Sequence, residues 1–157
     1  MQPSYLDGST SDIGYAAMAA TTVFDRILSG EIPCHRVYED EHTLVFMDIF
    51  PVADGHALVI TKQHAATIFD ADETALTAVA ATARRVAHAI RSVLAPDGLM
   101  VFQLNGAAAM QTVFHYHMHL LPRREGEALA LHTRVPGDPA RLAEVASQLA
   151  AALEDKS

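Results

Sequence analysis

The chain has 157 residues, half of them hydrophobic, and a formal net charge of −8 with histidine counted as neutral. This length fits one domain with a substantial core, and because no apolar run is long enough to cross a bilayer, we expect a soluble globular protein without a membrane partner. The negative charge argues against a surface that binds nucleic acid or anionic membranes. The single cysteine, Cys34, cannot form an internal disulfide, which fits a reducing compartment, and we expect the cytoplasm.

The N-terminal segment differs in composition from the rest of the chain. Ser, Thr, Gly and Asp dominate residues 1–14, and the first basic residue is Arg26, so the basic start of a signal peptide is missing. We predict a flexible arm over residues 1–21 and a folded domain over residues 22–157.

The first predicted elements are a short helix and three strands. The helix covers residues 23–28 and would end at Gly30. Two strands over residues 36–39 and 43–48 follow, joined by a polar turn. The next strand, over residues 56–61, has a continuous apolar middle, which indicates burial on both faces.

A long amphipathic helix is the clearest element of the second half. Apolar residues recur at three- and four-residue spacing as far as Leu94, and Asp70 is the predicted cap, with Glu73 three positions later. Strands over residues 99–104 and 112–121 come next. Asp138 followed by Pro139 then opens a last helix with four apolar residues on one side. Strands clustered around one long helix indicate an α+β domain.

The strand over residues 112–121 carries histidines at three alternate positions: His115, His117 and His119. Because alternate side chains of a strand point to the same face, the imidazoles would form one row, with the bulky apolar residues between them on the other face. Three imidazoles without partners inside a small fold would be costly, so the row needs a polar occupant.

Three kinds of partner could meet the imidazoles of this row: solvent, a metal ion or an extended anion. Strict alternation beside bulky apolar residues disfavours solvent. Two neighbouring histidines could chelate zinc, but the third lies too far along the strand, and other ligands would have to come from elsewhere. A phosphate chain suits the geometry best, with the central imidazole as nucleophile and its neighbours as donors of hydrogen bonds or protons.

The segment from His115 to His119 resembles the His-x-His-x-His motif of the histidine triad (HIT) family. The likeness continues in unbroken order over roughly residues 22–123. Its main segments are residues 24–27, 30–33, 37–40, 46–51, 55–60, 105–109 and 111–115. The resemblance implies an antiparallel sheet of about five strands with one long helix and a C-terminal helix, assembled as a homodimer.

For activity, the resemblance implies a hydrolase or transferase that cleaves at the α-phosphate of nucleoside phosphoramidates or dinucleoside polyphosphates. His117 would form a nucleotidyl-histidine, His115 would orient it, His119 would contact the phosphate and the leaving group, and His56 would lie beside the nucleophile. No cofactor and no catalytic metal are implied. The alternative is a nucleotide-binding or scaffolding protein with weak or no catalysis.

The resemblance also implies a binding site for a purine nucleoside monophosphate derivative. Asp48 would take the ribose hydroxyls, and the phosphate side would be formed by Gln111 and Thr112, next to the loop that contains Asn105. The apolar walls of the base pocket would be Phe24, Ile27, Phe46 and Leu58.

Three departures from the family pattern stand out. Leu104 replaces a polar Asn or Gln, and Met110 replaces a glycine, which motivates the alternative of weak catalysis. Some bacterial relatives bind zinc through a Cys-x-x-Cys near the start, and the matching positions here are Thr22 and Asp25. We therefore do not expect that zinc site.

Overall fold

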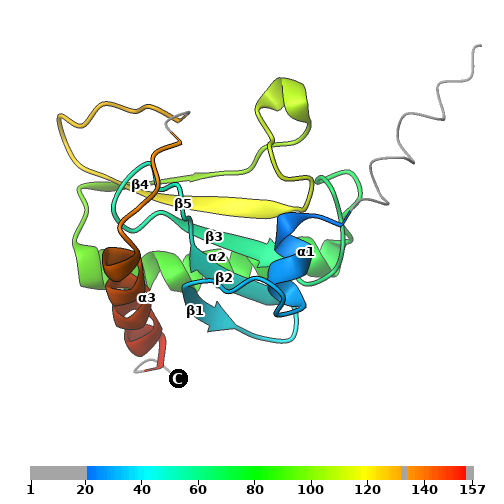
Figure 1. Cartoon of the computed structure of the whole chain (residues 1–157), viewed down its shortest axis with the longest axis horizontal. Coiled ribbons are helices and arrows are strands. Elements are labelled where there is room, and N and C mark those ends of the chain that lie inside the picture. Colours follow the sequence, from blue (N-terminus) through cyan, green and yellow to red (C-terminus); the bar gives the residue numbers. More distant parts are fainter. Residues whose placement is uncertain (1–20, 132–133, 155–157) are drawn as a thin grey trace, which may run out of the picture.

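A computed structural model, which describes residues 21–131 and 134–154, shows a five-stranded antiparallel sheet with α-helices on both faces (Figure 1). The strands lie in the order β1-β2-β3-β5-β4. Their bounds are β1 Arg36–Glu39, β2 Thr43–Met47, β3 Ala57–Thr61, β4 Gly98–Phe102 and β5 His117–Arg123. The helices are α1 Val23–Leu28, α2 Glu73–Leu94 and α3 Pro139–Glu154, with a 3-10 turn, η2, at Ala107–Ala109.

This architecture confirms the predicted α+β class. The predicted arm over residues 1–21 lies, apart from Thr21, outside the described residues. Within the part of the chain that the structure describes, no helix combines the length and apolarity needed to span a membrane.

β2 and β3 send alternate side chains into two separate cores, and all ten of their residues are buried. Val45 and Val59 face the core under α2 and α3, whereas Phe46 and Leu58 face a smaller core completed by Phe24 of α1. The predicted burial on both faces of the strand over residues 56–61 is thus confirmed. A strand with two buried faces needs a helix on each side, and Figure 1 shows α2 behind the sheet and α1 at one end of its other face.

The register of β5 decides which face its histidines occupy. His117 pairs with Ile60 and His119 with Leu58, so both histidines share the α1 face with these two residues. Met118, between them, packs into the α2 core. The predicted alternation is confirmed for this part of the row.

The predicted start of the histidine strand is wrong: β5 begins at His117 and not at residue 112. The amide of Gln111 bonds instead to the carbonyls of Ala66 and Val113, which holds the preceding segment as a loop. Tyr116 then donates its backbone N–H to the Ala65 carbonyl at 2.6 Å. His115 therefore lies in an irregular segment just before the strand.

The predicted cap of the long helix is also wrong, because Asp72 and not Asp70 caps α2, accepting a bond from the Ala75 N–H at 2.7 Å. The Asp70 carboxylate instead closes the preceding turn by accepting two bonds from Thr67. The helices over residues 23–28 and from Pro139 onward form as predicted. β4 ends two residues earlier than predicted, where the side chains of Gln103 and Asn105 bond to each other.

Gly55 allows the loop after β2 to turn back into β3. Its φ is +86°, a left-handed conformation that favours glycine, and a Cβ there would overlap Leu94 and come within 3.1 Å of Pro122. The close approach brings the loop, and His56 immediately after it, against the end of α2.

Gly55→Ala should lower the free energy of unfolding by at least about 2 kcal/mol, because it adds a steric overlap to the backbone strain. Gly126→Ala is the matched control: Gly126 has a φ of +81° with no atom near its would-be Cβ, so only strain of about 1 kcal/mol is expected. Urea unfolding of both variants measures the difference. Equal losses in the two variants would contradict the packing role of Gly55.

Candidate active site

His117 is the best-defined imidazole of the site. Its Nδ1 lies 2.6 Å from the backbone carbonyl oxygen of His115. Because a carbonyl can only accept, Nδ1 carries the proton and the neutral ring has its lone pair on Nε2. Burial is the main cause that lowers the pKa of His117, which keeps the ring neutral. A neutral imidazole with a free Nε2 lone pair can act as a nucleophile.

His56 and His119 form a second, coupled pair. The Val52 N–H donates to Nδ1 of His56 at 3.2 Å, so neutral His56 carries its proton on Nε2. That nitrogen lies 2.9 Å from Nδ1 of His119, to which it donates. Neutral His119 is therefore protonated on its own Nε2. The pair gives the site a hydrogen-bond donor beside the lone pair of His117, whose ring centroid lies 4.8 Å from that of His119.

The His119 ring is held from its face as well as through its nitrogen. The Phe102 ring stacks on it with centroids 4.4 Å apart and an interplanar angle of 5°. The two residues are cross-strand partners of β4 and β5. No pattern in the sequence points to Phe102, because the contact depends on the register between these strands.

Burial also sets the protonation of this pair. It lowers the pKa of His56 to about 4. Burial first, and then the positive charges that His117 and His56 would carry, lower the pKa of His119 to about 3. Both rings therefore stay neutral at neutral pH.

Asp48 lies at the same end of the sheet, where its carboxylate approaches His56 to 3.7 Å. Burial raises the pKa of this carboxyl, opposed by the hydrogen bond from the Phe50 N–H and by the positive charge that His117 would carry if protonated. Its side chain is 20% exposed, so it borders both the site and solvent.

The loop that orients His56 is held by the C-terminal part of the chain. Arg141 of α3 donates two hydrogen bonds to the Asp54 carboxylate, at 3.0 and 2.6 Å. The Gly137 N–H donates to the carbonyl of Ile49 at 2.9 Å. These contacts flank Val52, whose N–H fixes the tautomer of His56.

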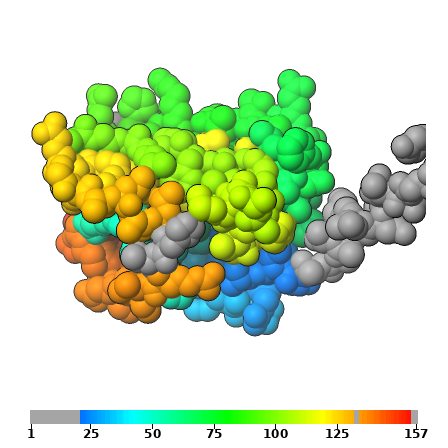
Figure 2. Space-filling view, turned by 90° about the horizontal axis from the view of Figure 1, so that it is seen from above, coloured from blue at the N-terminus to red at the C-terminus, as the bar shows by residue number. Residues whose placement is uncertain are grey.

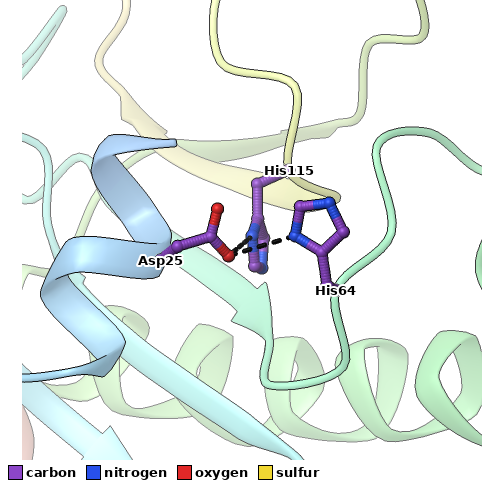
Figure 3. Close-up of side chains that lie close together, drawn as sticks. All are labelled: Asp25, His64 and His115. Atoms are coloured by element: carbon purple, nitrogen blue, oxygen red, sulfur yellow. Dashed lines mark hydrogen bonds and ion pairs between the residues drawn. The ribbon is translucent and has the colours of Figure 1, made fainter. Parts of the chain in front are cut away.

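His115 is fully buried and belongs to a separate cluster with Asp25 and His64 (Figure 3). Its Nε2 lies 2.7 Å from the Thr61 carbonyl and its Nδ1 3.2 Å from Oδ1 of Asp25. Nδ1 of His64 lies 3.1 Å from the same carboxylate oxygen. No local pattern in the sequence places His64 beside His115, because the two residues lie on separate segments of the chain.

Two groups of side chains place three possible metal-ligand atoms within 4.8 Å of one another among the described residues. One is Asp25, His64 and His115; the other is Asp48, His56 and His119. In the second group, Nε2 of His56 and Nδ1 of His119 are joined by a hydrogen bond. In the first, no thiolate is present, and Oδ2 of Asp25 already accepts from the backbone N–H and hydroxyl of Thr22. Hydrogen bonds within and around the groups satisfy both without an ion.

The predicted apolar wall comes together beside the histidines. Phe24, Phe46 and Leu58 are buried in one cluster, with Ile27 packed against it. The edge of the Phe24 ring faces the His117 ring, with centroids 5.1 Å apart. The structure therefore places an apolar group directly next to the candidate nucleophile.

Asn105, Gln111 and Thr112, the residues predicted on the phosphate side of the site, lie in or next to the loop before β5. This loop lies close to α1 in the view from above (Figure 2). Gln111 is buried with its amide fully engaged, since its carbonyl oxygen accepts from the Gly106 N–H. Asn105 accepts a bond from the Ile68 N–H at 2.7 Å. Thr112 is exposed. Gln111 and Asn105 thus shape the loop through backbone bonds, while Thr112 is free to face a ligand.

Met110 adopts the left-handed conformation, with φ of +70°, and is 42% exposed. A non-glycine residue there is strained by roughly 1–2 kcal/mol, which explains why a glycine suits this position. Leu104 is half-buried and offers no polar group to a ligand.

Comparisons with known proteins agree with this arrangement. The model of the HIT domain matches residues 29–126. Adenosine 5'-monophosphoramidase HNT1 of Saccharomyces cerevisiae is 38% identical over 110 residues, covering 70% of this chain and 67% of the yeast protein. Adenylylsulfatase HINT3 of Arabidopsis thaliana is 32% identical over 144 residues, covering 90% of this chain and 73% of the plant protein.

A solved structure shows the same fold. The zinc-bound histidine triad family protein from Mycobacterium smegmatis superimposes with a TM-score of 0.77 and 40% identity, over 89% of this chain and 96% of the other. Together with the strand register that aligns His117 and His119 on one face, these matches confirm the predicted family: the chain belongs to the histidine triad (HIT) family.

Proposed function

We propose that this chain is a nucleotide hydrolase or transferase that cleaves at the α-phosphate through a nucleotidyl-histidine on His117. The observation that carries the proposal is the 2.6 Å bond from Nδ1 of His117 to the His115 carbonyl, which leaves Nε2 unprotonated. The names of the yeast and plant relatives, a phosphoramidase and an adenylylsulfatase, support hydrolysis of a bond to a nucleotide phosphate.

In the proposed reaction, Nε2 of His117 attacks the α-phosphorus and forms a phosphorus–nitrogen bond, while the bond from phosphorus to the leaving group breaks. His119 donates a hydrogen bond from its Nε2–H to the departing atom, which takes its proton from solvent water. The 2.9 Å bond from Nε2 of His56 to Nδ1 of His119 supports this role, because it keeps the proton of His119 on Nε2. Water then attacks the phosphorus, releases the nucleoside monophosphate and restores His117.

The residues around His117 support a substrate in which the α-phosphate is attached to a nucleoside. We propose that the base lies along the apolar cluster of Phe24, Phe46, Leu58 and Ile27, and that Asp48 accepts hydrogen bonds from the ribose. Asp48 is the carboxylate that borders this end of the site and remains partly exposed. Thr112 is the exposed donor on the phosphate side.

His117→Ala should lower kcat for a fluorogenic nucleoside phosphoramidate at least about 1,000-fold, because it removes the attacking atom. His88→Ala, which changes an exposed histidine of α2, is the matched control and should keep the wild-type rate. Mass spectrometry of turnover mixtures quenched in alkaline denaturant should find the nucleotidyl adduct only in proteins that retain His117. Nucleotide affinity without turnover in the wild type would favour the binding-protein alternative.

The pH profile should reflect the lowered histidine pKa values. A lowered pKa keeps an imidazole neutral as the pH falls, so kcat/KM should stay flat as the pH falls through 6.5 and should decline only at lower pH. The measurement uses a substrate with a single phosphate charge over this range, with His117→Ala as the background. Half-loss of kcat/KM near pH 6.5, the ordinary histidine value, would contradict this assignment.

We also propose that two copies pair through β4. This strand lies at an edge of the sheet with Val101 48% exposed, next to Phe102, which stacks on His119. Val101→Glu should shift the protein to monomer, since it places a charge in the apolar contact. Val135→Glu is the control at a 66% exposed position outside the sheet. Light scattering after gel filtration measures both, and a wild-type monomer would refute the pairing.

A further inference from the structure

Phe102, the last residue of β4, is half-buried and belongs to neither of the two hydrophobic cores formed by the described residues. Its ring instead lies on the ring of His119, with centroids 4.4 Å apart and an interplanar angle of 5°. Packing into a core therefore does not account for this aromatic side chain. Its contact with a histidine of the site does.

The hydrogen bond to Nδ1 of His119 leaves the imidazole one freedom of movement. Nε2 of His56 donates to that atom at 2.9 Å, which holds one corner of the ring. The ring can still turn about the line of this bond, because the χ2 torsion of histidine has a broad energy well. Nε2 of His119 lies off that line, so such a turn would swing its N–H away from the departing atom.

The stacked ring of Phe102 removes this freedom. Two rings that lie flat on each other at 4.4 Å cannot turn independently without a clash or a loss of contact. The other rings around His119 meet it at an angle: His117 at 61° and His56 at 36°. Among the described residues, Phe102 is thus the ring that lies flat on His119 and fixes its plane.

The register of the sheet brings the two rings together. β4 is an edge strand that lies beside β5 (Figure 1), and Phe102 with His119 is the last pair between them. On its other side His119 pairs with Leu58 of β3. Without the Phe102 ring, one face of His119 would be open toward the edge of the sheet.

We propose that Phe102 is a positioning residue: its stacked ring holds the plane of His119, so that the N–H of Nε2 points at the departing atom. The inference rests on the proposed function. It does not depend on the charge of any histidine, because Nε2 of His119 keeps its proton as long as Nδ1 accepts the bond from His56. A donor oriented in advance stabilises the charge that develops on the departing atom, and the gain grows with the basicity of that atom.

The test varies the leaving group. The substrates are aryl esters of a nucleoside monophosphate whose phenols differ in pKa. Phe102→Leu keeps apolar bulk but has no flat face, so kcat should fall about 10-fold with the most basic phenol and much less with a nitrophenol, with KM changed little. Phe102→Tyr restores a flat ring and should recover the wild-type dependence on the leaving group.

Met100→Ala is the matched control. Met100 lies on the same strand and, two residues before Phe102, on the same face, where it pairs with Leu121. The variant removes apolar bulk from β4 without touching the ring on His119, so the dependence of kcat on the leaving group should stay as in the wild type.

A purely structural role of Phe102 would lower kcat by the same factor for every leaving group. That result would overturn the proposal. An unchanged kcat in Phe102→Leu would also overturn it, as would a loss in Phe102→Tyr as large as the loss in Phe102→Leu.

Proton NMR of the histidine rings provides a readout that needs no turnover. The stacked Phe102 ring should shift the ring-proton resonances of His119 upfield in the wild type and in Phe102→Tyr, and this shift should disappear in Phe102→Leu. If the wild type shows no hydrolysis, the proposed function fails, and the NMR shift still decides whether Phe102 holds the ring. A wild type without the upfield shift would refute the positioning role.

Discussion

The hydrogen bond from the His117 ring to the backbone carbonyl of His115 is the constraint on which the site depends. It determines which nitrogen of His117 is protonated, and therefore which one can bond to an electrophile. Because the acceptor belongs to the backbone, its direction is set by the path of the chain before β5. The Tyr116 N–H bond to Ala65 and the contacts of the His115 ring hold that path.

The two-sided sheet makes such precision possible. β2 and β3 are buried on both faces, so they cannot shift without disturbing two cores, and β5 pairs with β3 along the histidine positions. The same burial keeps the pKa values of His56, His117 and His119 below the ordinary range of histidine. Packing and protonation thus have one cause, namely the exclusion of water from the α1 face of the sheet.

Parts of the chain outside the histidine motif support the site through backbone groups. The loop that supplies the Val52 N–H is pressed against α2 through Gly55 and tied to α3 through Asp54 and Arg141. The C-terminal helix, which carries little family resemblance, therefore helps to hold the loop whose Val52 N–H fixes the tautomer of His56. In the same way, the N-terminal helix reaches the nucleophile through Asp25 and His115.

The sequence by itself determined the features that follow from local periodicity and from a recognisable motif. The alternation of His117 and His119 about Met118, the long helix ending at Leu94 and the short helix before Gly30 were all predictable, because their signals lie within a few neighbouring residues. The motif also predicted the family and the apolar group around Phe24.

Only the tertiary structure decided which distant side chains meet. The stacking of Phe102 on His119 follows from the register of β4 on β5, and the cluster of Asp25, His64 and His115 joins three separate segments. It also decided that Asp72 caps α2 and that β5 starts at His117, because competing side-chain bonds in the preceding loops occupy the alternatives. Such contacts depend on three-dimensional packing, which no local pattern encodes.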